Sequence, residues 1–434
     1  MSNSKTILVE PEEISTGNSP DWLETLKRES LDRYNSFDLP LRSAHLWRYT
    51  DPEKFLYTGN GVKPMVSSDA FPGYENALER LQNSELSAVV ADHAGREIEV
   101  KLGQDISSNN DIFIAPLREA IQERPELIKS RLGSVVGSSF GKFEALNSTL
   151  WADGILVYIP KGMELEKPIH LFHRGSTNDK WTFVRVLIIA EEDSSVTILD
   201  EYLSANDEVA GKNNTVVEIF GGRASRIQYV ALQRNNLNTV SYFSQRTLLD
   251  DDAKSTLVIA SFGGKLSKSD LGAVLKGAHA ESRQYGLVFG SGKQLFDHHT
   301  VHLHQGSHGY SNLDFKVALK DKSRSIYTGL IRVDANTPYC EAYQTNRNLL
   351  LNRGARAESI PELEILCDEV ICTHGATVGP IDPMEIFYLN SRGIPRTEAV
   401  RMIVRGHVEP TLKELSDVIR ERVSEFVEER LNSL

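Results

Sequence analysis

Cysteine is scarce in this sequence, and positive charge does not dominate it. The 434 residues include only three cysteines, Cys340, Cys367 and Cys372, and the formal net charge is −12. An odd, sparse set of cysteines does not make a disulfide framework, so we expect free thiols in a reducing, cytoplasmic compartment. An acidic chain without a basic stripe argues against nucleic acid as a partner, because phosphate binding needs lysine and arginine.

Other signals are missing as well. No apolar run reaches the roughly 18 residues of a membrane-spanning helix. The first twenty residues have neither the apolar segment of a secretory signal nor the arginines of a transit peptide. There is no GxxxxGK[ST] phosphate loop, no GxGxxG between a strand and a helix, and no GxSxG elbow. We therefore expect a chain that does not hydrolyse nucleotides itself.

The first part of the chain, residues 1–150, mixes helices and strands. Residues 21–35 have the apolar spacing of a helix with Asp21 as its N-cap. Residues 116–131 also predict a helix, interrupted at Pro125. Between them, residues 87–102 alternate like two strands around a turn. We expect an N-terminal α/β region.

Residues 151–381 consist of short β-rich runs without a convincing long helix. Clusters of small and charged residues recur between the runs and begin at residues 191, 221, 251, 277, 321 and 353. The steps are 30, 30, 26, 44 and 32 residues, and two shorter turns would explain the step of 44. A step near 30 favours the stacked coils of a β-helix over a β-sandwich, whose strands recur every 8–12 residues.

Residues 382–434 switch to a helical pattern. One helix is predicted from Asp382-Pro383 to Gly393, a second from Pro395, and a last one over roughly 410–432. One face of the last helix is apolar and the other carries mixed charge. Spacing alone leaves two interpretations open, a helix packed on its own domain or a docking surface for a partner. The apolar face consists of five candidate docking residues, Leu412, Leu415, Ile419, Val423 and Phe426, together with Val427.

The stretch ICTHGATVG, residues 371–379, is the first candidate for chemistry. On a strand, Cys372 and His374 would project from one face, whereas Cys367 has the opposite parity. Two such ligands make half of a metal site, which a second chain would have to complete. The structural alternative is a small buried cysteine beside a hydrogen-bonded histidine at a strand end.

The stretch DHHTVHLHQGSHGYS, residues 297–311, is the second candidate. It holds five of the twelve histidines, and on a strand three of them share a face. Their number suggests a metal site, but a ladder of histidines with a structural or interface role is the alternative. The five are His298, His299, His302, His304 and His308, of which His298, His302 and His304 share parity.

The residues from 358 to 394 are specific enough to support a resemblance. ESIPELEILCDEVICTHGATVGPIDPMEIFYLNSRGI resembles the SufB/SufD family of iron–sulfur cluster assembly proteins, and most closely its SufD branch. The segments WRYTD (47–51), FEALNSTLWADGILVYIPKG (143–162) and YTGLIRV (327–333) extend the match over nearly the whole chain. The SufB branch carries cysteines where this chain has YQTNRNLLLNRGARAESIPE, which favours SufD.

The resemblance implies a mainly β fold with a right-handed parallel β-helix core, here residues 151–381, flanked by helical N- and C-terminal regions. It implies a non-catalytic scaffold subunit that pairs with a SufB-like subunit. It also implies that a SufC-like ABC ATPase docks on residues 382–434, through the apolar face named above. Whether the isolated chain forms a homodimer stays open.

The resemblance also implies a role for the first candidate site. His374, and secondarily Cys372, would face the SufB-like partner and complete a shared site for a transient iron–sulfur cluster. With only three cysteines, the chain alone should hold no stable cluster. Two other functions remain as alternatives: an assembly protein with no metal role, and a β-helix enzyme that acts on an acidic polysaccharide, against which the negative charge speaks.

Overall fold

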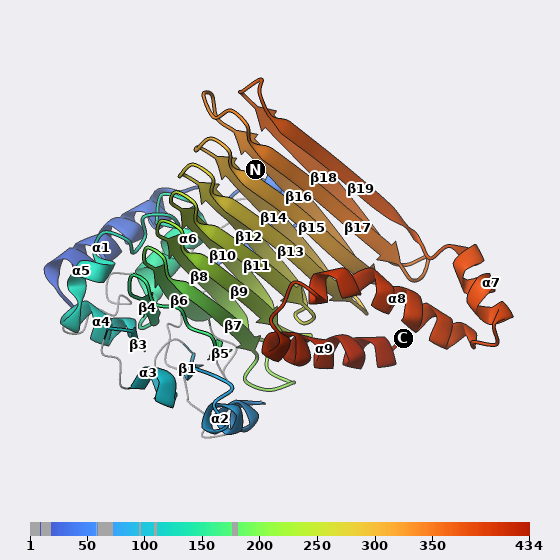
Figure 1. Ribbon diagram of the computed structural model, residues 1–434, viewed down its shortest axis with the longest axis horizontal. Helices are drawn as coiled ribbons and strands as arrows, with labels where there is room; N and C mark the ends of the chain where they lie inside the picture. The colour runs from blue at the N-terminus through green and yellow to red at the C-terminus, as the bar shows by residue number, and fades with distance from the viewer. Residues whose placement is uncertain are drawn as a thin grey trace.

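The computed structural model describes residue 9 and residues 19–57, 59, 73–94, 97–107, 111–175 and 181–434. The predictions on the first twenty residues therefore concern a segment that lies almost wholly outside the described residues. In the described part, strands form the centre of the molecule, and helices lie towards both ends of the chain (Figure 1). The predicted class, a mainly β core with helical N- and C-terminal regions, is confirmed.

The core is a parallel β-solenoid of about eight turns, in which consecutive strands alternate between two sheets. The ten-stranded sheet runs in the order β19 (Ile371–Pro380), β17 (Glu341–Leu350), β15 (Tyr310–Leu319), β13 (Glu281–Gly290), β11 (Lys254–Ser261), β9 (Arg226–Gln233), β7 (Ser195–Leu203), β5 (Ile169–Arg174), β1 (Ala88–His93) and β2 (Glu97–Leu102). The nine-stranded sheet runs in the order β18 (Arg356–Ile365), β16 (Arg324–Val333), β14 (Leu295–His304), β12 (Leu266–Leu275), β10 (Val240–Leu249), β8 (Lys212–Gly221), β6 (Trp181–Ala190), β4 (Ile155–Ile159) and β3 (Phe113–Pro116).

The register of the nine-stranded sheet gives the length of each coil. Paired strands begin at residues 181, 212, 240, 266, 295, 324 and 356, so a coil takes 26 to 32 residues. The predicted step near 30 is therefore the true repeat. Each coil contributes one strand to each sheet and hydrogen-bonds to its two neighbours, which is the nearly one-dimensional arrangement expected of a solenoid.

The corners of the solenoid explain the irregular step of 44. At the corner that leads from the nine-stranded to the ten-stranded sheet, every coil from β6 to β16 has a residue with a left-handed backbone and φ between 56° and 62°, and the corner after β16 has a second one, Asn336, with φ 63°. Each of the residues with φ between 56° and 62° at this corner donates its N–H to a carbonyl of the next coil, at 2.6 to 2.9 Å. The clusters at 191, 221, 251 and 277 lie at this corner, whereas those at 321 and 353 lie at the opposite corner. The step of 44 is thus a change of corner, and the explanation by two shorter turns is wrong. The donating left-handed residues are Asp193, Ala224, Asp252, His279, His308 and Tyr339.

The N-terminal region covers the outer face of the nine-stranded sheet. Side chains of α1 and α6 form one apolar cluster with Trp181, Phe183 and Tyr242 of the sheet. The helix predicted over 21–35 is present, but its N-cap is Pro20 and not Asp21. The two strands predicted within 87–102 are β1 and β2, which extend the ten-stranded sheet, so the sheets begin before residue 151. The helical elements are α1 (Asp21–Ser36), η2 (His45–Trp47), η3 (Pro52–Phe55), α2 (Tyr74–Gln82), α3 (Gln104–Ser107), α4 (Leu117–Glu123), α5 (Pro125–Ile128) and α6 (Lys142–Leu150).

Three helices follow the solenoid, namely α7 (Pro383–Ser391), α8 (Arg396–Leu412) and α9 (Asp417–Asn432). The first begins as predicted, because the Asp382 carboxylate accepts a hydrogen bond from the Met384 N–H at 2.9 Å. The last begins at Asp417 and not near 410, since Pro410 still belongs to α8. Helices α8 and α9 lie along the outer face of the ten-stranded sheet, and α7 projects beyond them (Figure 1).

None of the helices in the described ranges is both long and apolar enough to cross a membrane.

Candidate functional site

The two ends of the solenoid differ, and the candidate site lies at the C-terminal one. There, among the described residues, β18 and β19 pair only with the preceding coil, through β16 and β17. Both strands are ten residues long, and β19 contains no charged residue. At the other end the outermost strands, β2 and β3, are six and four residues long, and β2 carries Glu97, Glu99 and Lys101. We call β18 and β19 the open end.

An uncharged ten-residue edge strand offers a row of backbone N–H and C=O groups for pairing with another chain. Side chains of the open end are also poorly covered. Most residues of β19 are exposed and most of β18 are half-buried, whereas the inner strands are largely buried. The inner face of the last coil is therefore exposed to solvent, whereas in every earlier coil the following coil covers this face.

Cys372 and His374 both lie on the inner face of β19. Their register partners on β17 are Ala342 and Gln344, which are buried inside the solenoid. The prediction that the two side chains share a strand face is confirmed. His374 is exposed at the open end and Cys372 is half-buried. Burial, and to a lesser degree the nearby Cys340 thiol, raises the pKa of Cys372, so this side chain is a thiol at neutral pH.

The other two cysteines lie close to this position. Cys340 is buried, and its Sγ lies 3.4 Å from the carbonyl oxygen of Gly306. Cys367 is only half-buried and packs with Cys372 against the apolar cluster that contains Cys340. Cys367 lies in the turn before β19, so the parity argument does not apply to it. Across the described residues, no three His, Cys, Asp or Glu side chains are placed to hold a metal ion.

The five clustered histidines are divided among separate environments. His298, His302 and His304 point into the solenoid, where each ring contacts its own hydroxyl or amide group. The partners are Ser261 at 3.2 Å, Gln284 at 3.2 Å and Ser311 at 2.8 Å, respectively. The shared parity of the three is confirmed. Burial lowers their pKa values to about 4, about 3 and about 4, so all three rings are neutral at pH 7. His308 lies at an exposed corner and stacks on His279, with ring centroids 4.6 Å apart.

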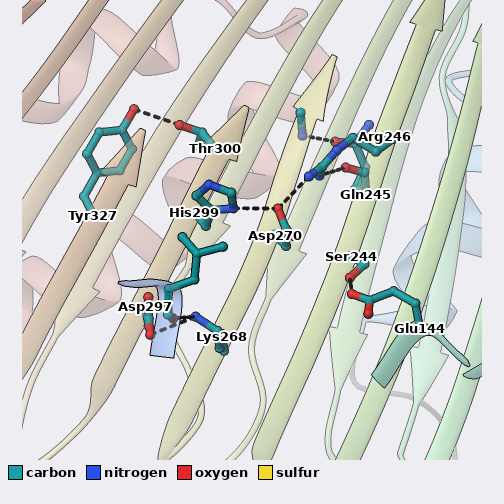
Figure 2. A network of polar contacts seen from close by, with 12 residues as sticks. Glu144, Ser244, Gln245, Arg246, Lys268, Asp270, Asp297, His299, Thr300 and Tyr327 are labelled. Atoms are coloured by element: carbon teal, nitrogen blue, oxygen red, sulfur yellow. Dashed lines mark hydrogen bonds and ion pairs between the residues drawn. The ribbon is translucent and has the colours of Figure 1, made fainter. Parts of the chain in front are cut away.

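His299 points the other way, onto the outer face of the nine-stranded sheet. Its Nδ1 lies 2.9 Å from the Asp270 carboxylate, which also accepts a hydrogen bond from Arg246 at 2.7 Å (Figure 2). Burial alone would raise the pKa of Asp270, but Arg246 and His299 hold it below its usual range. These three side chains lie on three successive coils, and sequence reasoning missed the group. The spacing of the coils, which places Asp270 opposite His299, is the feature of the sequence that could have revealed this group.

Two further contacts in this area join the N-terminal region to the sheet. Glu144 of α6 is buried and accepts hydrogen bonds from Ser244 at 2.6 Å and Tyr242 at 2.8 Å (Figure 2). Lys268 pairs with Asp297 at 3.0 Å, and Thr50 also hydrogen-bonds Asp297. These satisfied groups hold the covering region in place, because a buried polar atom is stable only with a partner.

The five residues predicted to form a docking surface are all buried within this chain. They pack with Leu287, Phe289 and other apolar residues of the ten-stranded sheet, and so hold α8 and α9 on the solenoid. This corrects the choice of residues, because a partner that docks on the helices must contact other side chains. The buried five are Leu412, Leu415, Ile419, Val423 and Phe426.

A buried ion pair strengthens the same attachment. The Glu201 carboxylate of β7 is fully buried and lies 3.0 Å from Arg422 of α9 and 3.2 Å from His170. Arg234 also pairs with it and lies over the Phe426 ring, 3.7 Å from its centroid. Burial alone would raise the pKa of Glu201, but His170, Arg422 and Arg234 lower it to about 2.

The most exposed large apolar side chains of residues 382–434 lie on α7. Met384, Phe387 and Tyr388 are 67%, 64% and 58% exposed, respectively. Between α7 and α8 lies a groove whose walls include Met384, Tyr388, Ile403 and His407. Three large apolar side chains on one nine-residue helix are an exposed patch of the kind that marks interaction sites.

Comparison with known proteins agrees with this architecture. Residues 173–407 match the family described as "SUF system FeS cluster assembly, SufBD core domain", and residues 7–171 match "SufBD protein N-terminal region". An "iron-sulfur cluster assembly SufBD family protein" of Staphylococcus aureus is 26% identical over 404 residues, which covers 92% of this chain and 87% of the relative. A protein of the same description from Staphylococcus saprophyticus is 25% identical over 402 residues, covering 91% and 86%.

Proposed function

Because this chain belongs to the SufBD family of iron–sulfur cluster assembly proteins, we propose that it is the SufD-like scaffold subunit of a SufBCD-type complex in the cytoplasm. It pairs with a SufB-like subunit, carries an ABC-type ATPase and performs no catalysis itself. The iron–sulfur cluster is the cargo of the complex. The observation that carries this proposal is the open end of the solenoid.

Pairing at the open end follows from what β18 and β19 leave unsatisfied. A related solenoid with the same kind of end could continue both sheets by strand addition, which supplies backbone hydrogen bonds along each edge. The exposed inner residues of β19, such as Ala376 and Val378, would then be covered by the partner. Such coverage removes apolar surface from water, which stabilises the pair of subunits by about 25 cal/mol for each Å² of apolar surface buried.

The shared site is proposed at the same junction. His374 is exposed on the inner face of β19, where a partner's last coil would meet it. A neutral imidazole binds iron without losing a proton, whereas Cys372 must first become a thiolate. His374 is therefore the principal ligand and Cys372 the auxiliary one. A cluster needs several thiolates, so the partner must supply most of the ligands.

The ATPase is proposed to dock on the exposed side of α7 and on the groove between α7 and α8. The opposite side of α8 and α9 is already occupied by the solenoid. Met384, Phe387 and Tyr388 supply exposed apolar and aromatic surface, which is enriched at the centre of protein interfaces.

Subunit pairing can be tested by placing a charge at the open end. Val378 is 46% exposed, so Val378→Lys should leave the isolated fold intact. In the complex, the same lysine would be buried without a counter-ion, which should weaken pairing with the SufB-like subunit at least tenfold. The measurement is the dissociation constant of the two purified subunits, together with the melting temperature of each variant.

The matched control for this experiment is Leu41→Lys. Leu41 is 71% exposed and belongs to the N-terminal region, so the same charge there should not affect pairing. Undiminished pairing by a folded Val378→Lys protein would show that the subunits meet elsewhere.

A further inference from the structure

Beneath His374 lies a row of three buried amide side chains on β17. Gln344, Asn346 and Asn348 face the interior and are 2%, 1% and 4% exposed. We call them the amide floor of the open end. Each has one buried polar atom without a hydrogen-bond partner in the described part of the chain, namely Oε1, Nδ2 and Oδ1, respectively. Unsatisfied buried polar atoms are uncommon and call for a partner.

The orientation of the Gln344 amide is fixed by its nitrogen. Nε2 donates to the Gly329 carbonyl at 3.2 Å and hydrogen-bonds the Tyr327 hydroxyl. The Gln344 and Tyr327 side chains both crowd Gly329, since a Cβ there would lie 2.1 Å from Nε2 and 2.7 Å from the hydroxyl. The Tyr327 hydroxyl is held in turn by Thr300 at 3.0 Å (Figure 2). Because a carbonyl can only accept, the amide cannot be flipped, and Oε1 remains the free acceptor.

The strand register then indicates which donor could form a hydrogen bond to Oε1. The inner-face neighbours of the amide floor on β19 are His374 opposite Gln344, Ala376 opposite Asn346, and Val378 opposite Asn348. Of these three side chains, only the imidazole carries a donor. Within the floor, Asn348 Nδ2 donates to Asn346 Oδ1 at 2.6 Å and to the Thr377 carbonyl at 3.2 Å, so it is already engaged. The other amide donor of the floor, Asn346 Nδ2, is buried and makes no hydrogen bond to Oε1 within the described residues.

We propose that Gln344 is the positioning residue of His374, with its Oε1 accepting a hydrogen bond from one ring N–H. That bond selects one tautomer of the neutral imidazole and leaves the other ring nitrogen, with its lone pair, directed out of the open end. Hydrogen bonds of this kind orient histidine ligands in metal sites and fix their tautomer. This inference rests on the proposed function in one respect, namely that His374 is the side chain that meets the cluster.

The test is the tautomer ratio of His374 in the full chain, read from ¹⁵N chemical shifts of ring-labelled histidine at a pH where the ring is neutral. The His374 signals are assigned by their loss in His374→Asn. Removing the acceptor with Gln344→Met should change the tautomer ratio about fivefold, which is what one ordinary hydrogen bond is worth. Gln344→Glu keeps an acceptor oxygen at this position and should retain the preference of the wild type.

The matched control is Asn348→Leu. It removes an amide from the same floor, including an unpaired oxygen, but lies opposite Val378. It should leave the His374 ratio unchanged. If Gln344→Met fails to fold, Gln344→Ala replaces it, because it also removes the acceptor oxygen and should shift the ratio in the same direction.

An unchanged ratio in a folded Gln344→Met or Gln344→Ala protein overturns the proposal, as does an equal shift in Asn348→Leu. Failure of the proposed function is a separate result. In that case the tautomer responds as expected, but replacing His374 leaves cluster formation by the assembled complex unchanged.

Discussion

At the scale of single residues, burial decides what each histidine can do. His374 is exposed at the open end, where a ligand can reach it, whereas His298, His302 and His304 are enclosed in the solenoid. The enclosed rings meet hydroxyl and amide groups and no carboxylate within hydrogen-bond distance. Their environment therefore favours the neutral form, and the fold loses stability when these rings are protonated.

This gives a prediction for stability in acid. In the unfolded chain a histidine titrates near 6.5, and in the folded chain these three titrate near 4, 3 and 4. Because the folded pKa values are the lower ones, the stabilisation is complete above pH 6.5 and is lost as the pH falls towards 4. At pH 5 each of these three histidines should lower the free energy of unfolding by about 2 kcal/mol. Urea unfolding from pH 7 to pH 5 measures the loss.

The variant for this experiment replaces all three interior histidines by glutamine. It should reduce the acid sensitivity markedly, even if its stability at pH 7 is lower. The control, His279→Gln, changes an exposed corner histidine and should leave the pH dependence as it is. An unchanged dependence in the triple variant would place the acid-sensitive groups elsewhere.

The strand face on which a side chain lies could be predicted from the alternation along the strand, but the burial of that side chain could not. The alternation of side chains along a strand correctly grouped Cys372 with His374, and His298 with His302 and His304. Parity does not say which face is the interior, because both faces of the inner strands are largely buried here. The unsatisfied Oε1 of Gln344 depends on contacts with Gly329 and Tyr327 from another strand, which no local pattern reveals.

At the scale of elements, a pattern identifies an apolar face but not what covers it. The apolar spacing of residues 412–426 was real, and the structure assigns that face to the solenoid. The docking interpretation chose the wrong side of the helices for the same reason, since a buried face and a docking face have the same periodicity. Likewise, clusters from two different corners looked like one irregular repeat until the strands could be placed.

The exposed helix α7 supplies the prediction at this scale. Phe387 is 64% exposed on α7, so Phe387→Asp should not unfold the isolated chain. It should weaken binding of the ABC-type ATPase by at least tenfold, because aromatic residues at the centre of an interface commonly contribute 2 kcal/mol or more, about thirtyfold in affinity. Calorimetric titration of the purified ATPase into the variant measures the change.

The control for α7 is Arg405→Ala. Arg405 forms a half-exposed ion pair with Glu428 on the other two helices, and such a pair is worth about 0–1 kcal/mol. Its loss should barely affect either the fold or the ATPase. If Phe387→Asp binds the ATPase as tightly as the unchanged chain, the docking surface does not include α7.

At the scale of the whole molecule, the solenoid runs from a covered end to an open one. Two short strands finish the sheets at the N-terminal end, and one of them, β2, is charged, whereas the last coil ends on the uncharged β19 and leaves the inner face of that strand exposed. The interior changes along the same axis, from the valine and isoleucine of the first coils to the histidines and amides of the last. The polar interior and the free edge meet at His374.

The most direct test of this account is the iron content of the three-protein complex when His374 is replaced. Wild-type, His374→Ala, Cys372→Ala and Thr373→Ala chains are each co-expressed with the SufB-like and ATPase subunits and purified without oxygen. Thr373 lies between the two candidates on the opposite face of β19, which makes it the matched control. One shortened side chain removes little of a large interface, so every complex should keep its subunit ratio on a sizing column. The account predicts that His374→Ala loses most of the iron and cluster absorbance, that Cys372→Ala loses less, and that Thr373→Ala loses none. A normal cluster yield in an intact His374→Ala complex would contradict it.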